Sequence, residues 1–204
     1  MTDYHFRAHH PMLSEEVAAE ASSYIDSLIN SGDHNWSTNF GWLRNGKEND
    51  INVPRMERYD NLCLVHRVIE SNRPLYEKIV RDIKRLYPAW EPEDPTAVQF
   101  FVWTGGSCIE WHVDVKKDDK NKNCRTGAVT IYLNRRWDIE WGGDFLFKDE
   151  KGHTQRVTPQ YNLGVAIRQV AHRSTKIQGR HFRKCIQIFM KDLPVAIDDD
   201  TNFC

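Results

Sequence analysis

The stretch AVTIYLNRRWDIEWGGDFLF (residues 128–147) is the part of this sequence that decides its fold class. It contains two short runs rich in β-branched and aromatic residues, 128–133 and 144–147, separated by polar residues and by the Gly142–Gly143 pair. Residues of this kind, bounded by Asn and Gly, are typical of short β-strands separated by turns.

Similar short apolar runs occur on both sides of this stretch, again separated by turn residues. They are Ala97–Trp103, Arg156–Val157, Leu163–Ile167 and Lys184–Met190. Many short strands without helices between them predict a β-sandwich or a β-barrel.

The N-terminal part of the chain has a different pattern, which predicts helices. Ser14 followed by two acidic residues is typical of a helix start, and apolar residues then recur at helical spacing as far as Gly32. A second amphipathic pattern through the 70s and early 80s ends before Pro88. The overall prediction is a mainly β protein with N-terminal helices.

One structural domain is expected, because 204 residues with 40% hydrophobic content suffice for one sizeable core. Within it, residues 1–95 are predicted to form a helical and loop elaboration packed on a core of residues 96–204. Periodicity does not decide whether residues 36–62 are loops, edge strands or part of a substrate pocket. Residues 116–125 (KKDDKNKNCR) are expected to be a solvated loop or a lid.

The charge balance gives no electrostatic reason to expect nucleic acid or an anionic membrane as a partner, since 28 Lys and Arg face 29 Asp and Glu. Five scattered cysteines, none in a CxxC pair, favour reduced thiols and a cytoplasmic protein. The chain shows no signal peptide and no apolar stretch of the roughly 18 to 20 residues that would span a bilayer. We therefore expect a soluble protein.

The tripeptide His112-Val113-Asp114 is the first candidate for chemistry. On a strand, residues i and i+2 point to the same face, so an imidazole and a carboxylate can converge on one ion. Two histidines and one carboxylate form the arrangement that suits non-haem Fe(II), so a further ligand must come from elsewhere in the fold. By itself an HxD pair is weak support, because such pairs often arise by chance.

The order of the features that follow makes the pattern more specific. After HVD come Tyr132–Asn134, Trp137, Gly142–Phe147, His172 and Arg183. In this order the segment from about Gln99 to Lys191 resembles the double-stranded β-helix, or jelly-roll, core of the 2-oxoglutarate/Fe(II)-dependent dioxygenases. It is most similar to their prolyl-4-hydroxylase-like branch.

This resemblance implies a catalytic metal site and its cofactors. His112, Asp114 and His172 match the family's ligand triad for Fe(II), and the implied co-substrates are 2-oxoglutarate and O2. Related halogenases have a small residue in place of the carboxylate, so Asp114 implies hydroxylation instead of halogenation.

The resemblance also implies an anchor for the far carboxylate of 2-oxoglutarate. Arg183 lies on the apolar strand that follows His172, where the family carries its basic residue, and a guanidinium binds both carboxylate oxygens at once. Arg180 is the alternative, but it adjoins Gly179 and so favours a turn. Tyr132 matches a position whose phenol contacts the same carboxylate, with core packing as the alternative.

The substrate remains open at this stage. Trp103 and Arg168 are candidate pocket residues, although Trp103 could equally pack in the core and Arg168 could point outward. Three functions compete: hydroxylation of a small molecule such as a free amino acid or a biosynthetic intermediate, hydroxylation of prolyl or other residues in proteins, and non-catalytic binding by a cupin-like protein. The small molecule is favoured, because Arg55, Arg58, Trp36 and Trp42 are available to cap the barrel. The sequence does not determine the oligomeric state.

Overall fold

The computed structural model describes residues 6–31, 37–38, 63–92, 97–114 and 127–190. Its helical elements are α1 (Glu15–Ser31), α2 (Val68–Ser71), α3 (Arg73–Leu86) and the 3-10 turn η3 (Ile139–Trp141). Its strands are β1 (Phe6–His9), β2 (Ser37–Thr38), β3 (Cys63–Arg67), β4 (Val98–Trp103), β5 (Ile109–His112), β6 (Gly127–Tyr132), β7 (Phe145–Lys148), β8 (Thr154–Val157), β9 (Gly164–Arg168), β10 (His172–Ser174) and β11 (Arg183–Met190). None of the helices in these ranges is long and apolar enough to cross a membrane.

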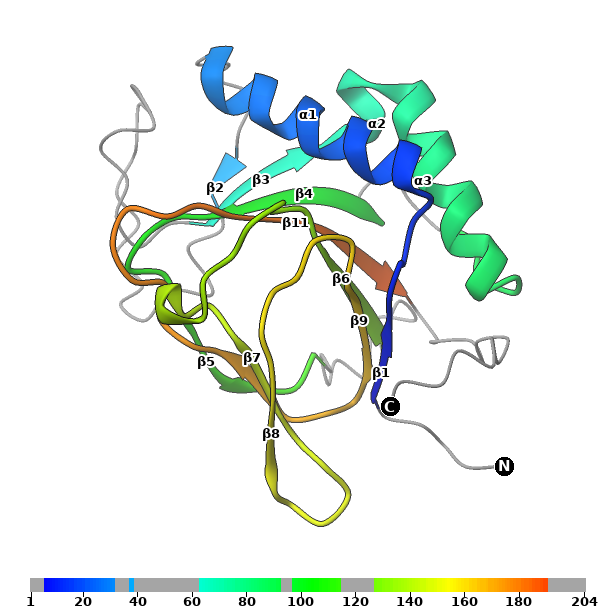
Figure 1. Ribbon diagram of the computed structural model, residues 1–204. Coiled ribbons are helices and arrows are strands. Elements are labelled where there is room, and N and C mark those ends of the chain that lie inside the picture. Colours follow the sequence, from blue (N-terminus) through cyan, green and yellow to red (C-terminus); the bar gives the residue numbers. More distant parts are fainter. Residues whose placement is uncertain (1–5, 32–36, 39–62, 93–96, 115–126, 191–204) are drawn as a thin grey trace.

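The strands form two antiparallel sheets. Seven strands make the larger sheet in the order β1-β9-β6-β11-β4-β3-β2, and four make the smaller one in the order β5-β10-β7-β8. The helices cover one face of the larger sheet, and the smaller sheet lies on its other side (Figure 1).

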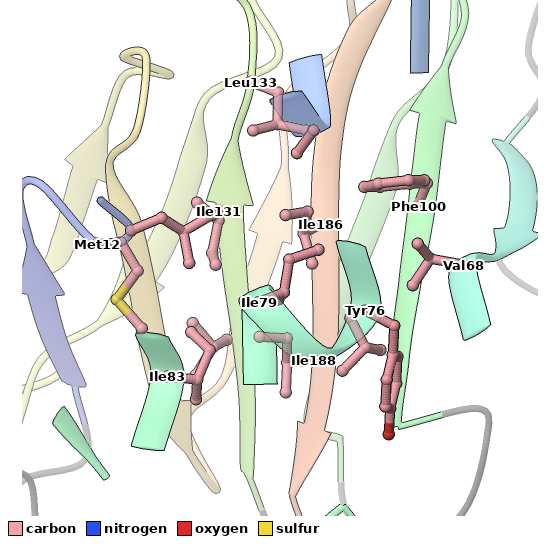
Figure 2. Close-up of a cluster of buried hydrophobic side chains, with 14 of the residues drawn as sticks. Met12, Val68, Tyr76, Ile79, Ile83, Phe100, Ile131, Leu133, Ile186 and Ile188 are labelled. Carbon is pink, nitrogen blue, oxygen red and sulfur yellow. The ribbon is translucent and has the colours of Figure 1, made fainter. Parts of the chain in front are cut away.

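Helix α3 packs its apolar face on the larger sheet. It begins at Asn72, whose side chain accepts a hydrogen bond from the Leu75 backbone N–H, and Pro74 occupies its first turn. Ile79 and Ile83 are fully buried against strand residues such as Ile188, as Figure 2 shows. Burying a side chain of this size stabilises the fold by about 1.5–3 kcal/mol.

Alternation along β11 separates two cores. Ile186 and Ile188 belong to the cluster under the helices, whereas Cys185 belongs to a second cluster that also contains Phe145 and Phe147 of the smaller sheet. Successive strand residues point to opposite faces, so Arg183 and Gln187 share the face of Cys185. The side chains of Arg183 and Gln187 therefore point into the space between the two sheets.

The predicted mainly β architecture with N-terminal helices is confirmed in the described residues, and the predicted strands after residue 96 appear as β4, β6, β7, β8, β9 and β11. The N-terminal part also contributes strands, since β1 pairs with β9 and β3 pairs with β4. Those two strands were not predicted. Within 36–62 the structure describes only β2, and the predicted loop 116–125 and the boundary at residue 95 lie outside the described residues.

Candidate active site

His112, Asp114 and His172 converge, and they form the one group of three potential metal ligands among the described residues. One ligand atom from each lies within 4.8 Å of the others. Oδ1 of Asp114 is 3.4 Å from Nε2 of His112 and 3.8 Å from Nε2 of His172. The two imidazole centroids are 4.1 Å apart. Two imidazoles and one carboxylate at this separation form a donor set that fits Fe(II).

The register of the smaller sheet brings the two histidines together. His112 ends β5 and His172 begins β10, and the two residues are directly paired across these antiparallel strands. Asp114 follows β5 in a bend. The convergence thus joins residues from two separate parts of the sequence.

Both imidazoles are oriented by backbone carbonyl groups. Nδ1 of His112 lies 2.8 Å from the Glu110 carbonyl oxygen, and Nδ1 of His172 lies 2.8 Å from that of Val170. A carbonyl oxygen only accepts, so each Nδ1 donates its hydrogen and each neutral ring keeps its lone pair on Nε2. Both Nε2 atoms are therefore prepared as ligands, and the carbonyl partners fix their direction.

Burial and the Asp114 carboxylate shift the two histidine pKa values in opposite directions. Burial lowers the pKa of His112, but hydrogen bonds with Asp114 and Glu110 and the charge of Asp114 raise this pKa above its ordinary value of 6.5. Deeper burial dominates at His172 and lowers its pKa below 6.5, although Asp114 and the Val170 carbonyl partly offset this. His172 is consequently the more readily neutral ligand.

Arg183 is a buried cation in the same pocket as two residues of the triad. Only 4% of the residue is exposed, and it lines a pocket with Asp114 and His172. Its guanidinium carbon lies 5.4 Å from the ring centroid of Trp103 and 6.0 Å from that of Tyr132. Nη1 donates to the Gly143 carbonyl and, at 2.5 Å, to Ser174 Oγ.

The remaining edge of this guanidinium is prepared for an anion. Nε of Arg183 is buried and has no hydrogen-bond partner in the described part of the chain. A buried cation with an unused donor is costly unless a ligand or partner neutralises it. An anionic ligand group, such as a carboxylate, fits this position.

The Gly142–Gly143 pair explains how a backbone carbonyl reaches Arg183. Both glycines have positive φ, +65° and +69°. A Cβ at Gly142 would lie 2.2 Å from the Lys176 carbonyl oxygen, and one at Gly143 would lie 3.4 Å from Cδ of Arg183. The predicted turn is therefore also part of the wall behind Arg183.

The structure brings most of the candidate residues named from the sequence together. Tyr132 and Trp103 line the pocket of Arg183, and both are buried. Arg168, at the end of β9, is not among the described residues that line it. Trp36, Trp42, Arg55 and Arg58 lie outside the described residues.

Three uncharged polar residues of the pocket, Thr130, Ser174 and Gln187, were missed from the sequence, as was the charged Arg173. Ser174 contacts Arg183, and Thr130 donates to Gln187 Oε1 at 2.7 Å. Each of these three lies two or four residues from a recognised position on the same strand, so i, i+2 alternation from His172, Tyr132 and Arg183 would have placed them on the pocket side.

Comparisons with known proteins agree with this site. Residues 98–191 match the family model of the 2OG-Fe(II) oxygenase superfamily, whereas no curated protein sequence matches the chain. The fold is similar to that of a Pseudomonas putida prolyl-4-hydroxylase, with a TM-score of 0.59 and 14% identity over 92% of both chains. It is similar to a Trichoplax adhaerens prolyl hydroxylase in complex with a hypoxia inducible factor peptide fragment, with a TM-score of 0.59 and 13% identity over 91% of this chain and 83% of that one. A 2OG-Fe(II) oxygenase family oxidoreductase from Burkholderia pseudomallei gives a TM-score of 0.50 and 16% identity, covering 94% and 87%.

These findings identify the β-rich part of the chain as a 2OG-Fe(II) oxygenase domain. Within that class its structural neighbours are prolyl-4-hydroxylase-like, as the sequence resemblance implied. Members of this family use Fe(II), 2-oxoglutarate and O2, and in this chain His112, Asp114 and His172 form the group that could hold the metal. The alternative of a non-catalytic cupin-like protein is not retained.

Proposed function

We propose that the two sheets form a double-stranded β-helix and that the chain is a hydroxylase with its iron site at His112, Asp114 and His172. The observation that carries this proposal is the shared pocket of Asp114, His172 and Arg183. A carboxylate and an imidazole that could bind a metal match the keto-acid end of a 2-oxo dicarboxylate. A buried guanidinium with an unused donor in the same pocket matches its far carboxylate.

Each residue has a distinct role in this proposal. His112, Asp114 and His172 would hold Fe(II), and the keto-acid end of 2-oxoglutarate and O2 would bind to the same ion. Arg183 binds the far carboxylate, and Tyr132, whose ring adjoins the guanidinium, contributes its phenol to the same group.

The bound iron and 2-oxoglutarate supply the oxidising chemistry, in which 2-oxoglutarate and O2 yield succinate, CO2 and a hydroxylated substrate. The chain contributes orientation and exclusion of water. Phe101, Trp103 and Phe145 line the pocket beside the charged groups, so the carboxylate binds Arg183 in an apolar surrounding that strengthens their attraction.

For the substrate, we propose a small polar molecule such as a free amino acid or a biosynthetic intermediate. Support comes from Thr130, Gln187 and Arg173, which add polar and charged groups to the described lining of the pocket. A prolyl or other protein hydroxylase is the second candidate, favoured by the prolyl hydroxylases among the similar structures, one of which is in complex with a peptide fragment.

The test of the proposed function is anaerobic addition of Fe(II) and then 2-oxoglutarate to the purified protein. Binding of both at one site gives a metal-to-ligand charge-transfer absorption band, and candidate amino acids or peptides that bind beside the iron shift it. Absence of the band with 2-oxoglutarate would overturn the proposed site. A shift and succinate formation with proline-containing peptides, but not with small molecules, would favour the second candidate.

A further inference from the structure

We infer that Ser174 is a positioning residue for the co-substrate: its hydroxyl holds the Arg183 guanidinium so that the Nε–Nη2 edge receives the far carboxylate. This inference rests on the proposed role of Arg183. It assigns a function to a serine that neither the sequence pattern nor the metal triad requires.

The hydrogen bonds of Arg183 carry the first step. Within the described residues, the guanidinium donates two hydrogen bonds, and both come from Nη1. One goes to the Gly143 carbonyl and the other to Ser174 Oγ. Nη1 has two hydrogens, so these acceptors saturate it. The Nε hydrogen and one Nη2 hydrogen point along the adjacent edge, which forms the parallel pair of donors that a carboxylate accepts.

The position of Ser174 carries the second step. His172 and Ser174 are i and i+2 on β10, so both side chains face the same pocket about 7 Å apart along the strand. One short strand therefore carries a proposed metal ligand and the residue that orients the carboxylate anchor. Ser174 is 5% exposed, so little water competes for its hydrogen bond.

The groups around the Arg183 guanidinium show what the Ser174 hydroxyl contributes. The rings of Trp103 and Tyr132 flank the guanidinium, and Gly143 belongs to a backbone turn on its Nη1 side. The carbonyl of Gly143 is fixed by that turn, whereas Ser174 supplies the second acceptor through a side chain. Losing the hydroxyl leaves one Nη1 hydrogen without an acceptor, so the rigid guanidinium can rotate about its side-chain bonds and move its Nε–Nη2 edge away from the carboxylate.

The experiment compares Ser174→Ala and Ser174→Cys with the wild-type protein in anaerobic titrations of 2-oxoglutarate into the Fe(II)-loaded protein. We expect the Kd for 2-oxoglutarate to rise about tenfold, the typical loss for one buried hydrogen bond, with the Fe(II) Kd unchanged. Ser174→Thr, which keeps the hydroxyl, should restore most of the affinity. Ser174→Cys keeps the side-chain volume and so serves if Ser174→Ala fails to fold.

A matched control is Ser22→Ala. Ser22 is 3% exposed and donates to the Leu133 carbonyl at 3.0 Å, and it lies on α1, away from the residues that line the pocket. This variant should lose thermal stability to a similar degree without any change in the Kd for 2-oxoglutarate.

A second ligand separates positioning from a general effect on the pocket. 2-Oxopentanoate keeps the keto-acid end and the five carbons but lacks the far carboxylate, so its Kd should not respond to Ser174→Ala. The inference is overturned if the Kd for 2-oxoglutarate stays within twofold of wild type, or if both ligands lose affinity equally. Absence of 2-oxoglutarate binding by the wild-type protein would instead overturn the proposed function.

Discussion

His112 and His172 are direct cross-strand partners, His112 at the end of β5 and His172 at the start of β10. Their pairing places the centroids of the two imidazoles 4.1 Å apart, although 59 residues separate them in the sequence. A slip of one residue in this register would turn one ring to the other face of the sheet. The metal site therefore depends on the pairing of the smaller sheet as much as on the identity of its ligands.

Replacing His172 by alanine is predicted to abolish iron-dependent activity. The variant keeps one imidazole and one carboxylate, and loss of a ligand should weaken Fe(II) binding by more than the ~10–100-fold that accompanies loss of a ligand's hydrogen-bonded neighbour. Fe(II) titration and succinate production measure the two effects. His153→Ala is the control, because that side chain is 71% exposed on the turn between β7 and β8. Unchanged succinate production by His172→Ala would show that the metal assignment is wrong.

Fe(II) affinity is predicted to fall as the pH decreases. Binding needs both imidazoles neutral, and the pKa of His112 lies above 6.5 because Asp114 and the Glu110 carbonyl outweigh the effect of burial. Protons therefore compete with the metal at His112 first, while the lowered pKa of His172 keeps that ring neutral to lower pH. Below the pKa of His112 the Kd should rise about tenfold per pH unit.

Anaerobic titrations of Fe(II) at several pH values check this sign. The loss of affinity should begin above pH 6.5, the ordinary pKa of histidine, because the pKa of His112 is raised. A Kd that stays constant down to about pH 6 would contradict the assignment of His112 as a ligand that must lose its proton.

Local sequence patterns predicted much of the fold because they report the environment of each segment. The apolar run 185–190 becomes a strand with both faces covered, and the amphipathic pattern through Ile79 and Ile83 becomes a helix on the sheet. Strand β3 was missed because Cys63–Arg67 is a short run whose strand character comes from pairing with β4, which lies more than thirty residues later. Pairing partners of this kind are not encoded in a local period.

In the candidate site, too, some residues could be predicted from the sequence and others only from the fold. Arg183 was predicted as the anchor because a family pattern gives its position after His172, and it lies buried beside Trp103. Ser174 carries no such mark, since a single serine on a strand becomes informative only when the fold brings Arg183 to 2.5 Å from its hydroxyl. Sequence patterns therefore predicted the charged candidates, whereas the contact of Ser174 with Arg183 required the three-dimensional structure.

Arg183→Lys is predicted to weaken 2-oxoglutarate binding although it keeps the positive charge. An ammonium cannot donate simultaneously to Gly143, Ser174 and both carboxylate oxygens, so at least one charged hydrogen bond is lost, which corresponds to roughly 10–100-fold in Kd. The charge-transfer titration measures the Kd, with Fe(II) affinity as the internal reference. Arg81→Lys, at a side chain 68% exposed on α3, is the matched control and should leave the Kd unchanged. Equal Kd values for Arg183→Lys and wild type would remove Arg183 from the carboxylate site.

Gly142→Ala is predicted to destabilise the fold more than Gly152→Ala. Both glycines have positive φ, +65° and +78°, so alanine is strained at either, and Gly142, with ψ −143°, lies in a region that only glycine commonly adopts. At Gly152 nothing lies within 4 Å of the added Cβ, whereas at Gly142 it would lie 2.2 Å from the backbone oxygen of Lys176. Relieving that overlap must separate the chain around Gly142 from its bridge partner Ile177, which should cost a further ~1–3 kcal/mol.

Denaturant unfolding of the two variants measures this difference directly. Because the next residue, Gly143, accepts a hydrogen bond from Arg183, Gly142→Ala should also raise the Kd for 2-oxoglutarate, while Gly152→Ala should not. Equal free energies of unfolding for the two variants would mean that the close approach of Gly142 to the Lys176 carbonyl does not contribute to stability. If Gly142→Ala were destabilised but bound 2-oxoglutarate with wild-type affinity, the turn would not be needed to orient Arg183. Ser174 would then be the acceptor that orients it.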